Sequence, residues 1–256
     1  MSRANPLRDA GLAFSLMTVV PTHATLPDDG SVPQAAGWFP MIGLALGAVG
    51  YGLVKAMETL PLRHSQPLLL ATIVVAVWAL LTRFLHFDGL ADVADGFWGS
   101  HDPARRLEIM SDSHTGAFGA TALVLATLLE VAALAAVLAA PRELPLLLVP
   151  ALSRFSATAG CWLGTPARAG GLGRSVMARP TVIGALPAVA VLAVVAVGLW
   201  LGFGVAGAVL FAFGLVVALG VPHALAGRFG GVTGDVLGAS VLLTEAIVFV
   251  AIALVG

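Results

Sequence analysis

Seven apolar stretches, each about 20 residues long, constrain this sequence more than any other feature. A helix of about 20 residues crosses the hydrocarbon core of a bilayer, which is about 30 Å thick. The mean hydropathy is +0.98 and only 11% of the 256 residues are charged, a balance that soluble domains of this size do not show. We therefore predict an all-α, polytopic integral membrane bundle. The predicted spans cover residues 36–56, 67–85, 119–140, 144–163, 182–201, 204–226 and 238–255.

The N-terminal segment predicts a further helix that lies on the membrane rather than across it. Arg3 and Arg8 precede a short apolar stretch, residues 12–20, and Asp9 interrupts the approach to it. We therefore expect an interfacial helix instead of a cleaved secretory signal. No domain boundary or fixed-period repeat is visible, so we expect residues 1–256 to form a single integral membrane domain.

The distribution of basic residues predicts the orientation of this bundle. If the N-terminus is cytoplasmic, three basic residues fall on the outer side, namely Lys55, Arg63 and Arg142. The cytoplasmic side and the inner end of the second span hold nine, namely Arg3, Arg8, Arg83, Arg105, Arg106, Arg168, Arg174, Arg179 and Arg228. Because basic loops stay inside, we predict a cytoplasmic N-terminus and an external C-terminus. The charged, glycine-rich loops 86–118, 164–181 and 227–237 then share the cytoplasmic side, where an active site can be assembled.

Charge and cysteine content exclude several other classes of protein. The net charge of −1 and the lack of any Lys/Arg run give no basis for a nucleic-acid partner. The single cysteine, Cys161, excludes an internal disulfide and any cysteine-based zinc or iron–sulfur site.

The stretch HFDGLADVADG, residues 86–96, places Asp88, Asp92 and Asp95 directly after an apolar run. If the stretch is helical, the spacings i, i+4 and i+7 put all three carboxylates on one face. Like charges this close destabilise a helix unless a cation lies among them, and oxygen-only ligands suit Mg²⁺, with Mn²⁺ as the alternative. The spacing predicts a metal site. The other interpretation is a solvated acidic loop with ordinary helix caps.

The following stretch, RRLEIMSDSHTG, adds Glu108 and Asp112 four residues apart, with Arg105 and Arg106 about one turn earlier. Carboxylates that bind a divalent metal beside arginines and glycine-rich backbone are the groups that phosphoryl transfer requires, because metal and arginine neutralise the phosphate oxygens. This part of the sequence therefore indicates phosphoryl-transfer chemistry.

Two glycine-rich loops carry further candidate residues. ARAGGLGRS, residues 167–175, has Gly171 and Gly173 between Arg168 and Arg174, which suits anion binding. An ordinary turn is the alternative. The second loop is GGVTGDVLGA, residues 230–239, and we expect a helix to begin within it. The free backbone N–H groups at the N-terminus of that helix would favour binding of a phosphate. Its candidates are Thr233, Gly234 and Asp235, and a simple N-cap before the last span is the alternative.

Four more ionisable residues lie within or next to the predicted spans. Arg154 and Glu245 are candidate partners for each other or for the site, whereas Glu130 has no evident partner. Such residues are functional candidates by default, with structural pairing as the alternative. His86 either assists metal or substrate or is a structural histidine.

The strings LHFDGLADVADGFWG, RRLEIMSDSHTGAFGA, GGLG and GGVTGDVLGA resemble motifs of the cobalamin synthase family, the adenosylcobinamide-GDP ribazoletransferases. FSLMTVVP and WFPMIGLALGAVG resemble the N-terminal segment and first span of that family, so the resemblance runs nearly end to end. His114 stands where the family often has an arginine.

The resemblance implies a Mg²⁺-dependent enzyme of the bacterial cytoplasmic membrane that completes adenosylcobalamin. Its substrates would be adenosylcobinamide-GDP and α-ribazole or its 5′-phosphate, and GMP would be released. The implied metal ligands are Asp88, Asp92, Asp95 and Asp112, and Asp92 or Asp95 would be the catalytic base, with His86 assisting. The implied substrate-binding residues are Arg105, Arg106, Glu108, Ser113, Arg154, Gly171, Gly173, Arg174, Thr233, Gly234 and Asp235, with Glu245 in a supporting role. The implied surroundings are the lipid bilayer, and the sequence is compatible with an oligomer.

Two other functions fit the sequence less well. A CDP-alcohol phosphotransferase would carry an arginine where Asp92 stands. A carrier would use intramembrane Glu130, Arg154 and Glu245, but it would show paired broken spans and inverted-repeat symmetry. The sequence shows neither, and its acidic residues gather in one loop instead.

Overall fold

The computed structural model describes residues 5–24, 34–58, 66–140, 143–168, 175–177 and 179–255. The described residues are helical apart from turns, loops and one isolated bridge. The helices are α1 (Pro6–Met17), the 3-10 turn η1 (Ala35–Trp38), α2 (Phe39–Glu58), α3 (Pro67–Leu81), α4 (Leu85–Gly99), α5 (Pro103–Ile109), α6 (Ala117–Ala139), α7 (Leu144–Leu163), α9 (Val182–Phe203), α10 (Val205–Phe229) and α11 (Gly234–Val255). The predicted all-α bundle is confirmed.

Six of the described helices are long and apolar enough to cross a membrane. They are α2 together with η1, then α6, α7, α9, α10 and α11. Helices α3 and α4 pass the same test only as a pair, which is bent by 88° and would make a seventh span. The chain is therefore a multi-pass membrane protein, as its hydropathy predicts.

The bend between α3 and α4 corrects the predicted span 67–85, because helix α3 stops at Leu81. The backbone N–H of Phe84 donates to Ala79 and that of Arg83 donates to Leu80. This hydrogen-bond pattern is a Schellman turn, which usually has glycine in its left-handed position. Here Arg83 and Phe84 take φ values of 53° and 57° instead. The turn redirects the chain, so α4 leaves the direction of the spans.

Helices α7 and α11 form the centre of the bundle, since most of their side chains are buried. Helices α9 and α10 are mostly exposed at the periphery, where lipid would cover their apolar side chains. Helix α2 packs closely on α7, because Gly43 and Gly47 lie directly against the backbone of Pro150 and Leu147. Small residues at helix crossings allow this close approach in membrane proteins.

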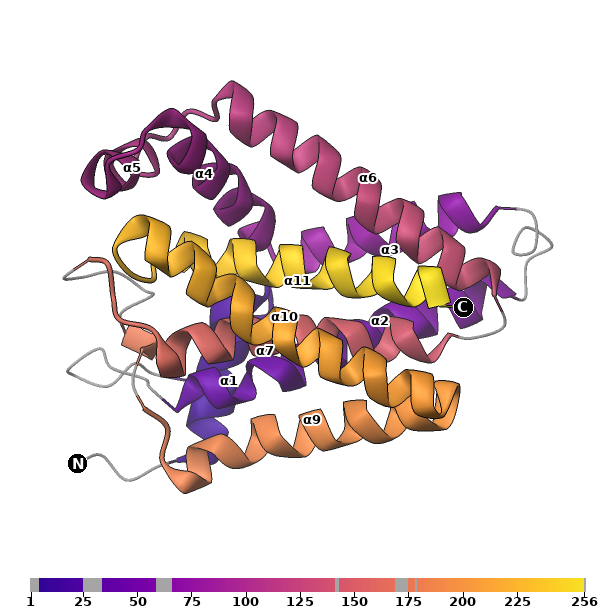
Figure 1. Cartoon of the computed structure of the whole chain (residues 1–256). Helices are drawn as coiled ribbons and strands as arrows, with labels where there is room; N and C mark the ends of the chain where they lie inside the picture. Colours follow the sequence, from indigo (N-terminus) through magenta and orange to yellow (C-terminus); the bar gives the residue numbers. More distant parts are fainter. Residues whose placement is uncertain are drawn as a thin grey trace.

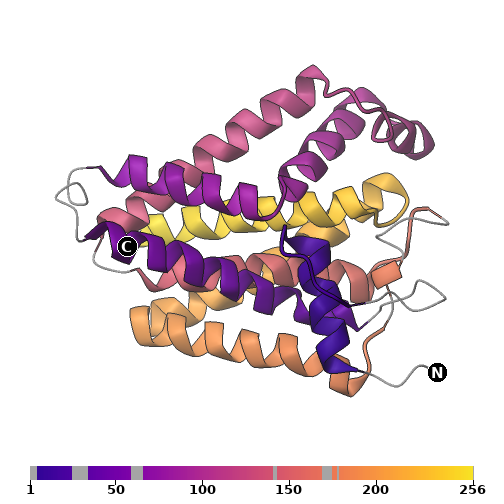
Figure 2. The same cartoon turned by 180° about the vertical axis from the view of Figure 1, so that it is seen from behind.

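The loops expected to share one side do lie together. Figures 1 and 2 show α5, residues 164–168 and the turn between α10 and α11 at one end of the bundle, and α11 ends at the other. Helix α1 lies near the loop end and crosses the long helices at a steep angle (Figure 2). It begins with Pro6, and the Asn5 side chain accepts a hydrogen bond from the Arg8 backbone. A helix is thus present where the interfacial helix was predicted.

Candidate active site

Helix α4 carries the aspartates Asp88, Asp92 and Asp95, so the predicted helical spacing is confirmed. It packs along α11 through two glycines. The Gly89 backbone lies so close that a Cβ there would be 2.7 Å from the backbone oxygen of Asp235. Gly238, one turn further along α11, faces the backbone of Leu85. This crossing brings the α4 carboxylates beside the first turn of α11.

Among the carboxylates at this crossing, Asp92 is influenced by the charges of all the others. Its helix, α4, is not one of the six spans. Burial raises the pKa of Asp92 to about 7, and the charges of Asp235, Asp88 and Asp95 act in the same direction while Arg168 opposes them. We call Asp88, Asp92, Asp235 and Arg168 the α4–α11 site. Asp235 was predicted as a substrate-binding residue, and the fold brings it next to the α4 aspartates.

Arg168 reaches this site from the loop that follows α7. Its guanidinium donates to the backbone oxygen of Leu107 at 2.8 Å and to the Ser111 hydroxyl at 3.0 Å. Its charge also acts on both Asp92 and Asp235. The site thus combines acidic groups with one cation, as phosphate chemistry requires.

Asp95 has a different set of contacts from Asp88 and Asp92. Its two carboxylate oxygens accept hydrogen bonds from the backbone N–H groups of Gly116, at 2.7 Å, and Gly119, at 2.8 Å. These groups belong to the N-terminus of α6, whose first N–H groups have no partner within the helix. Asp95 therefore caps α6 from outside that helix.

Asp112 lies in the exposed turn between α5 and α6, together with Ser113. It accepts hydrogen bonds from the His114 backbone at 3.0 Å and from His114 Nδ1 at 2.7 Å. These bonds hold the pKa of Asp112 below its usual range. Within the described ranges, no three His, Cys, Asp or Glu side chains lie close enough to hold a metal ion together. The structure therefore does not gather the four predicted metal ligands in one place.

The predicted arginines of α5 differ in their surroundings. Arg105 is exposed and pairs with Glu108 at 2.7 Å. Arg106 is buried, and its guanidinium donates to three backbone oxygens, those of Ser100, Arg228 and Phe97. The guanidinium also stacks near the rings of Phe97 and Phe229. Arg106 thus ties α5 to the ends of α4 and α10.

The two glycine-rich loops are joined by backbone pairing, which the sequence did not predict. Ala167 N–H donates to Val232 at 3.0 Å, and Val232 N–H donates to Thr165 at 2.8 Å. Gly231, at φ 148°, lies against Ala167, where a Cβ would be 2.7 Å from its nitrogen. This pairing holds the loop of Arg168 beside the start of α11. Gly171, Gly173 and Arg174 lie outside the described residues.

Thr233 and Gly234 start α11. The Thr233 hydroxyl accepts from Val236 N–H at 3.1 Å and donates to Asp235 at 3.3 Å. Thr233 is therefore the N-cap that the sequence offered as an alternative, and it also orients Asp235. Gly234 is exposed beside them.

Arg154 and Glu245 pair with each other inside the bundle, both nearly fully buried. The Ser153 hydroxyl also donates to the Glu245 carboxylate. His86 is buried at the start of α4. The partner that the sequence suggested for Arg154 is thus present.

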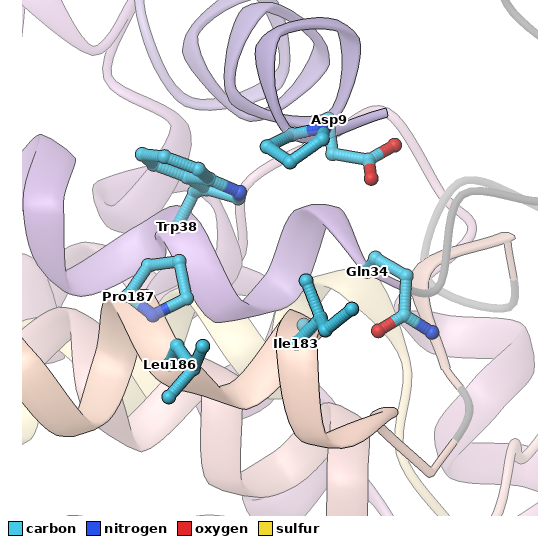
Figure 3. Close-up of a pocket in the computed structure, with 8 residues that line it drawn as sticks. Asp9, Gln34, Trp38, Ile183, Leu186 and Pro187 are labelled. Atoms are coloured by element: carbon cyan, nitrogen blue, oxygen red, sulfur yellow. The ribbon is translucent and has the colours of Figure 1, made fainter. Parts of the chain in front are cut away.

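Two cavities open at the loop end. One of about 630 Å³ lies at the end of α7, with walls from Trp162, Thr165, Met177 and Arg179 among others. The other, of about 180 Å³, lies beneath α1 (Figure 3). Its walls are mostly apolar, and Figure 3 shows Asp9 together with Gln34 on the side away from Trp38. The larger cavity adjoins the loop that carries Arg168.

Comparison with known proteins decides the family. The family model described as cobalamin-5-phosphate synthase matches residues 9–253. The chain belongs to this family. A similar protein from Syntrophobacter fumaroxidans, named adenosylcobinamide-GDP ribazoletransferase, is 42% identical over 90% of this chain and 91% of its own length. Two further similar proteins have the same name. The one from Pseudomonas paraeruginosa is 38% identical over 95% of this chain and 96% of its own length. The one from Frankia casuarinae is 39% identical over 93% of this chain and 91% of its own length. No solved structure matches the chain.

Membership of the cobalamin-5-phosphate synthase family agrees with the resemblance that the motifs carry. The aspartate motif forms α4, and the GGVTGD motif forms the turn and first residues of α11. The two strings that identify the family are thus the two that meet at the α4–α11 site. Arg179, in the wall of the larger cavity, was not singled out from the sequence because it lies outside every motif.

Proposed function

We propose that this chain joins adenosylcobinamide-GDP to α-ribazole, or to its 5′-phosphate, and releases GMP. A ribose hydroxyl oxygen would attack the phosphorus that bears the cobinamide arm, the bond from that phosphorus to GMP would break, and the hydroxyl proton would pass to a carboxylate. The observation that carries the proposal is the α4–α11 site, in which acidic groups and Arg168 meet in a chain of this family.

Asp92 is the better of the two candidate bases. Both oxygens of Asp95 already accept hydrogen bonds from the N-terminus of α6. Asp92 is half-buried beside Arg168, and no hydrogen bond to a helix end occupies it among the described contacts. A base must be within hydrogen-bond reach of the proton that it accepts, which favours a carboxylate with a free oxygen.

We propose that Mg²⁺ or Mn²⁺ binds beside Asp92 together with the substrate, whose phosphate oxygens would supply ligands, because no three side chains of the described residues lie close enough to hold the ion by themselves. The donor set fits such a cation because it consists of oxygen ligands only, and because the carboxylates around Asp92 repel one another. When bound, the metal would supply positive charge against the pyrophosphate oxygens. Removal of divalent metal with EDTA should abolish GMP release, and added Mg²⁺ should restore it. Full turnover in EDTA would refute the proposal that the reaction requires a divalent metal.

We propose that α-ribazole enters the cavity at the end of α7. A volume of about 630 Å³ is within the usual range for small-molecule sites. Trp162 and Met177 offer apolar surface to an aromatic base, and Arg179 offers a cation to a 5′-phosphate. The loop that forms one wall also carries Arg168, which would connect this cavity to the reacting phosphorus.

We propose that the site faces the cytoplasm of a bacterial cell, because the basic residues favour that side. Cys161 is the only cysteine and is buried, so a labelling background is low. A cysteine introduced by His101→Cys should resist an impermeant thiol reagent added outside intact cells and react after permeabilisation. Ready labelling in intact cells would show that residue 101 faces the outside and that the proposed orientation is wrong.

The direct test of activity uses purified protein in lipid nanodiscs with adenosylcobinamide-GDP, α-ribazole and Mg²⁺. GMP and the cobalamin product should form in equal amounts and only when both substrates are present. If neither product forms while vesicles show metal-ion flux, the transport alternative replaces the enzyme.

A further inference from the structure

The turn between α3 and α4 contains two consecutive residues in a backbone conformation that side chains disfavour. Arg83 and Phe84 have φ values of 53° and 57°, and among the described residues they are the only ones other than glycine with a positive φ. In this left-handed region the Cβ atom lies too close to the following carbonyl oxygen. Non-glycine residues remain in it only where the surrounding structure forces them to. Contacts from outside the turn must therefore hold it.

The same turn decides the direction of α4. Phe84 is the N-cap residue of α4, and its backbone oxygen accepts a hydrogen bond from the Asp88 N–H at 2.9 Å. The pair α3 and α4 is bent by 88° at this point. A change in the torsion angles of Arg83 or Phe84 would therefore swing α4, and with it Asp88 and Asp92, relative to α11.

Helix α1 and the residues that follow it contact this turn from outside, where Figure 2 shows the end of α1 beside the junction of α3 and α4. The Arg83 guanidinium donates to the backbone oxygen of Ser15 on α1 at 3.2 Å. The backbone N–H of Val19 donates to the backbone oxygen of Leu81, the last residue of α3, at 2.8 Å. The N-terminal segment is thus attached to the turn at two points, although the two segments are far apart in the sequence.

Helix α1 is itself held in the bundle, so it can support the turn. Its residues Leu12 and Met17 are buried, and it packs on η1 and α2. The chain after α1 folds back along the helix, because the Thr22 hydroxyl donates to the backbone oxygen of Gly11 at 2.9 Å. The backbone groups that bond to the turn are therefore fixed in position.

We propose that Arg83 is a positioning residue for the α4–α11 site and that α1 is the support through which it acts. The bonds that involve Ser15 and Val19 keep the turn left-handed, and the turn keeps α4 in the direction that brings Asp92 beside the first turn of α11. This role rests on the proposed function, because it concerns groups that act in catalysis. The alternative is that Arg83 is one more basic residue of the cytoplasmic side, whose charge alone matters.

The support by α1 can be tested without any activity, by measuring a distance from α4 to a spanning helix. Nitroxide labels would be attached at Trp98→Cys, near the end of α4, and at Leu201→Cys, near the end of α9. Both positions are well exposed, at 68% and 76%, and the native Cys161 is buried. Double electron–electron resonance in nanodiscs then gives the distribution of distances between the two labels in the wild-type background and in each variant.

Two variants remove the two bonds separately in this doubly labelled protein. Arg83→Gly adopts the left-handed conformation without steric cost but does not bond to Ser15. Val19→Pro removes the N–H that bonds to Leu81 and changes no charge, and the preceding Thr18 is extended, as a residue before proline should be. Each variant should broaden the distance distribution. A distribution of wild-type width in Arg83→Gly would overturn the proposal, and one in Val19→Pro would overturn support by α1.

The positioning role is tested by comparing stability with turnover in Arg83→Gly. Its thermal midpoint should stay near that of the wild type, because glycine relieves the left-handed strain in exchange for the lost bond. Its kcat for GMP release should nevertheless fall at least about 10-fold with KM unchanged, because α4 is displaced. Arg83→Lys keeps a donor for Ser15 and should restore most of the kcat. An Arg83→Gly enzyme that matches the wild-type kcat would refute the positioning role, even if its distance distribution is broad.

These measurements separate the failure of this inference from the failure of the proposed function. A wild-type protein that releases no GMP would refute the function, while the distance measurement would still decide whether α1 supports α4.

Discussion

The crossing of α4 and α11 leaves no room for a side chain at Gly89, and this allows a quantitative prediction for Gly89→Ala. A Cβ at this position would lie 2.7 Å from the backbone oxygen of Asp235 and 3.3 Å from the nitrogen of Ala239. Ordinary van der Waals contact begins at 3.4 Å. The first contact is therefore about 0.7 Å too short, and backbone atoms of a helix cannot turn away as a flexible side chain can.

The two helices must separate by roughly this amount in Gly89→Ala, and Asp88 and Asp92 then move away from Asp235. A misplacement of about 1 Å in an active site can cost about 100-fold in rate. We therefore expect kcat for GMP release to fall about 10- to 100-fold, although alanine favours the helix by about 1 kcal/mol relative to glycine.

Gly52→Ala is the matched control for this experiment. Gly52 also lies within a helix, α2, and no atom lies within 4 Å of a Cβ built there. The control enzyme should keep the wild-type kcat, and both variants should be measured in the same nanodiscs. If Gly89→Ala and Gly52→Ala turn over within two-fold of each other, the close crossing does not position the site.

Three further predictions concern residues around the site. Asp95→Ala removes the cap of α6 and should lower the free energy of unfolding by about 1–2 kcal/mol in a reversible SDS titration; no change would mean that the cap does not stabilise α6. Arg106→Lys loses most of three charge-assisted bonds to backbone oxygens and should cost about 2–4 kcal/mol in the same titration, whereas equal stability would contradict its structural role. Trp162→Ala should raise KM for α-ribazole at least 10-fold and leave KM for adenosylcobinamide-GDP unchanged, with Trp200→Ala, at the exposed far end of α9, as control. Equal effects on the KM of both substrates would contradict the proposal that α-ribazole binds in this cavity.

Hydropathy predicted the spans well, because the thickness of the bilayer sets the length of an apolar helix. Helix α7 begins and ends at the predicted residues, 144 and 163, and α9 begins at residue 182 as predicted. The span 67–85 was wrong at its end, since α3 stops at Leu81. The turn that ends α3 has Arg83 where glycine is usual, so the sequence contains no glycine or proline that would have predicted the end of the helix there.

The helical spacing of the aspartates was predictable, but their partners were not. Spacing places Asp88, Asp92 and Asp95 on α4, yet the tertiary packing directs Asp95 to the N-terminus of α6. Asp235 joins Asp92 only because Gly89 and Gly238 let two helices far apart in sequence approach each other. Both motifs contain several glycines, and the sequence alone does not indicate which glycine of one helix faces which glycine of the other.

The most direct test of the account compares three variants in the GMP-release assay: Asp92→Asn, Asp235→Asn and Asp112→Asn. Asp92 and Asp235 belong to the α4–α11 site, whereas Asp112 is exposed and pairs with His114. Loss of a group that stabilises transition-state charge removes several kcal/mol, so the first two variants should lose at least about 100-fold in kcat. Asp112→Asn should stay within about three-fold of wild type. If Asp112→Asn is inactive while Asp235→Asn turns over normally, the site lies in the turn after α5 and not where α4 meets α11.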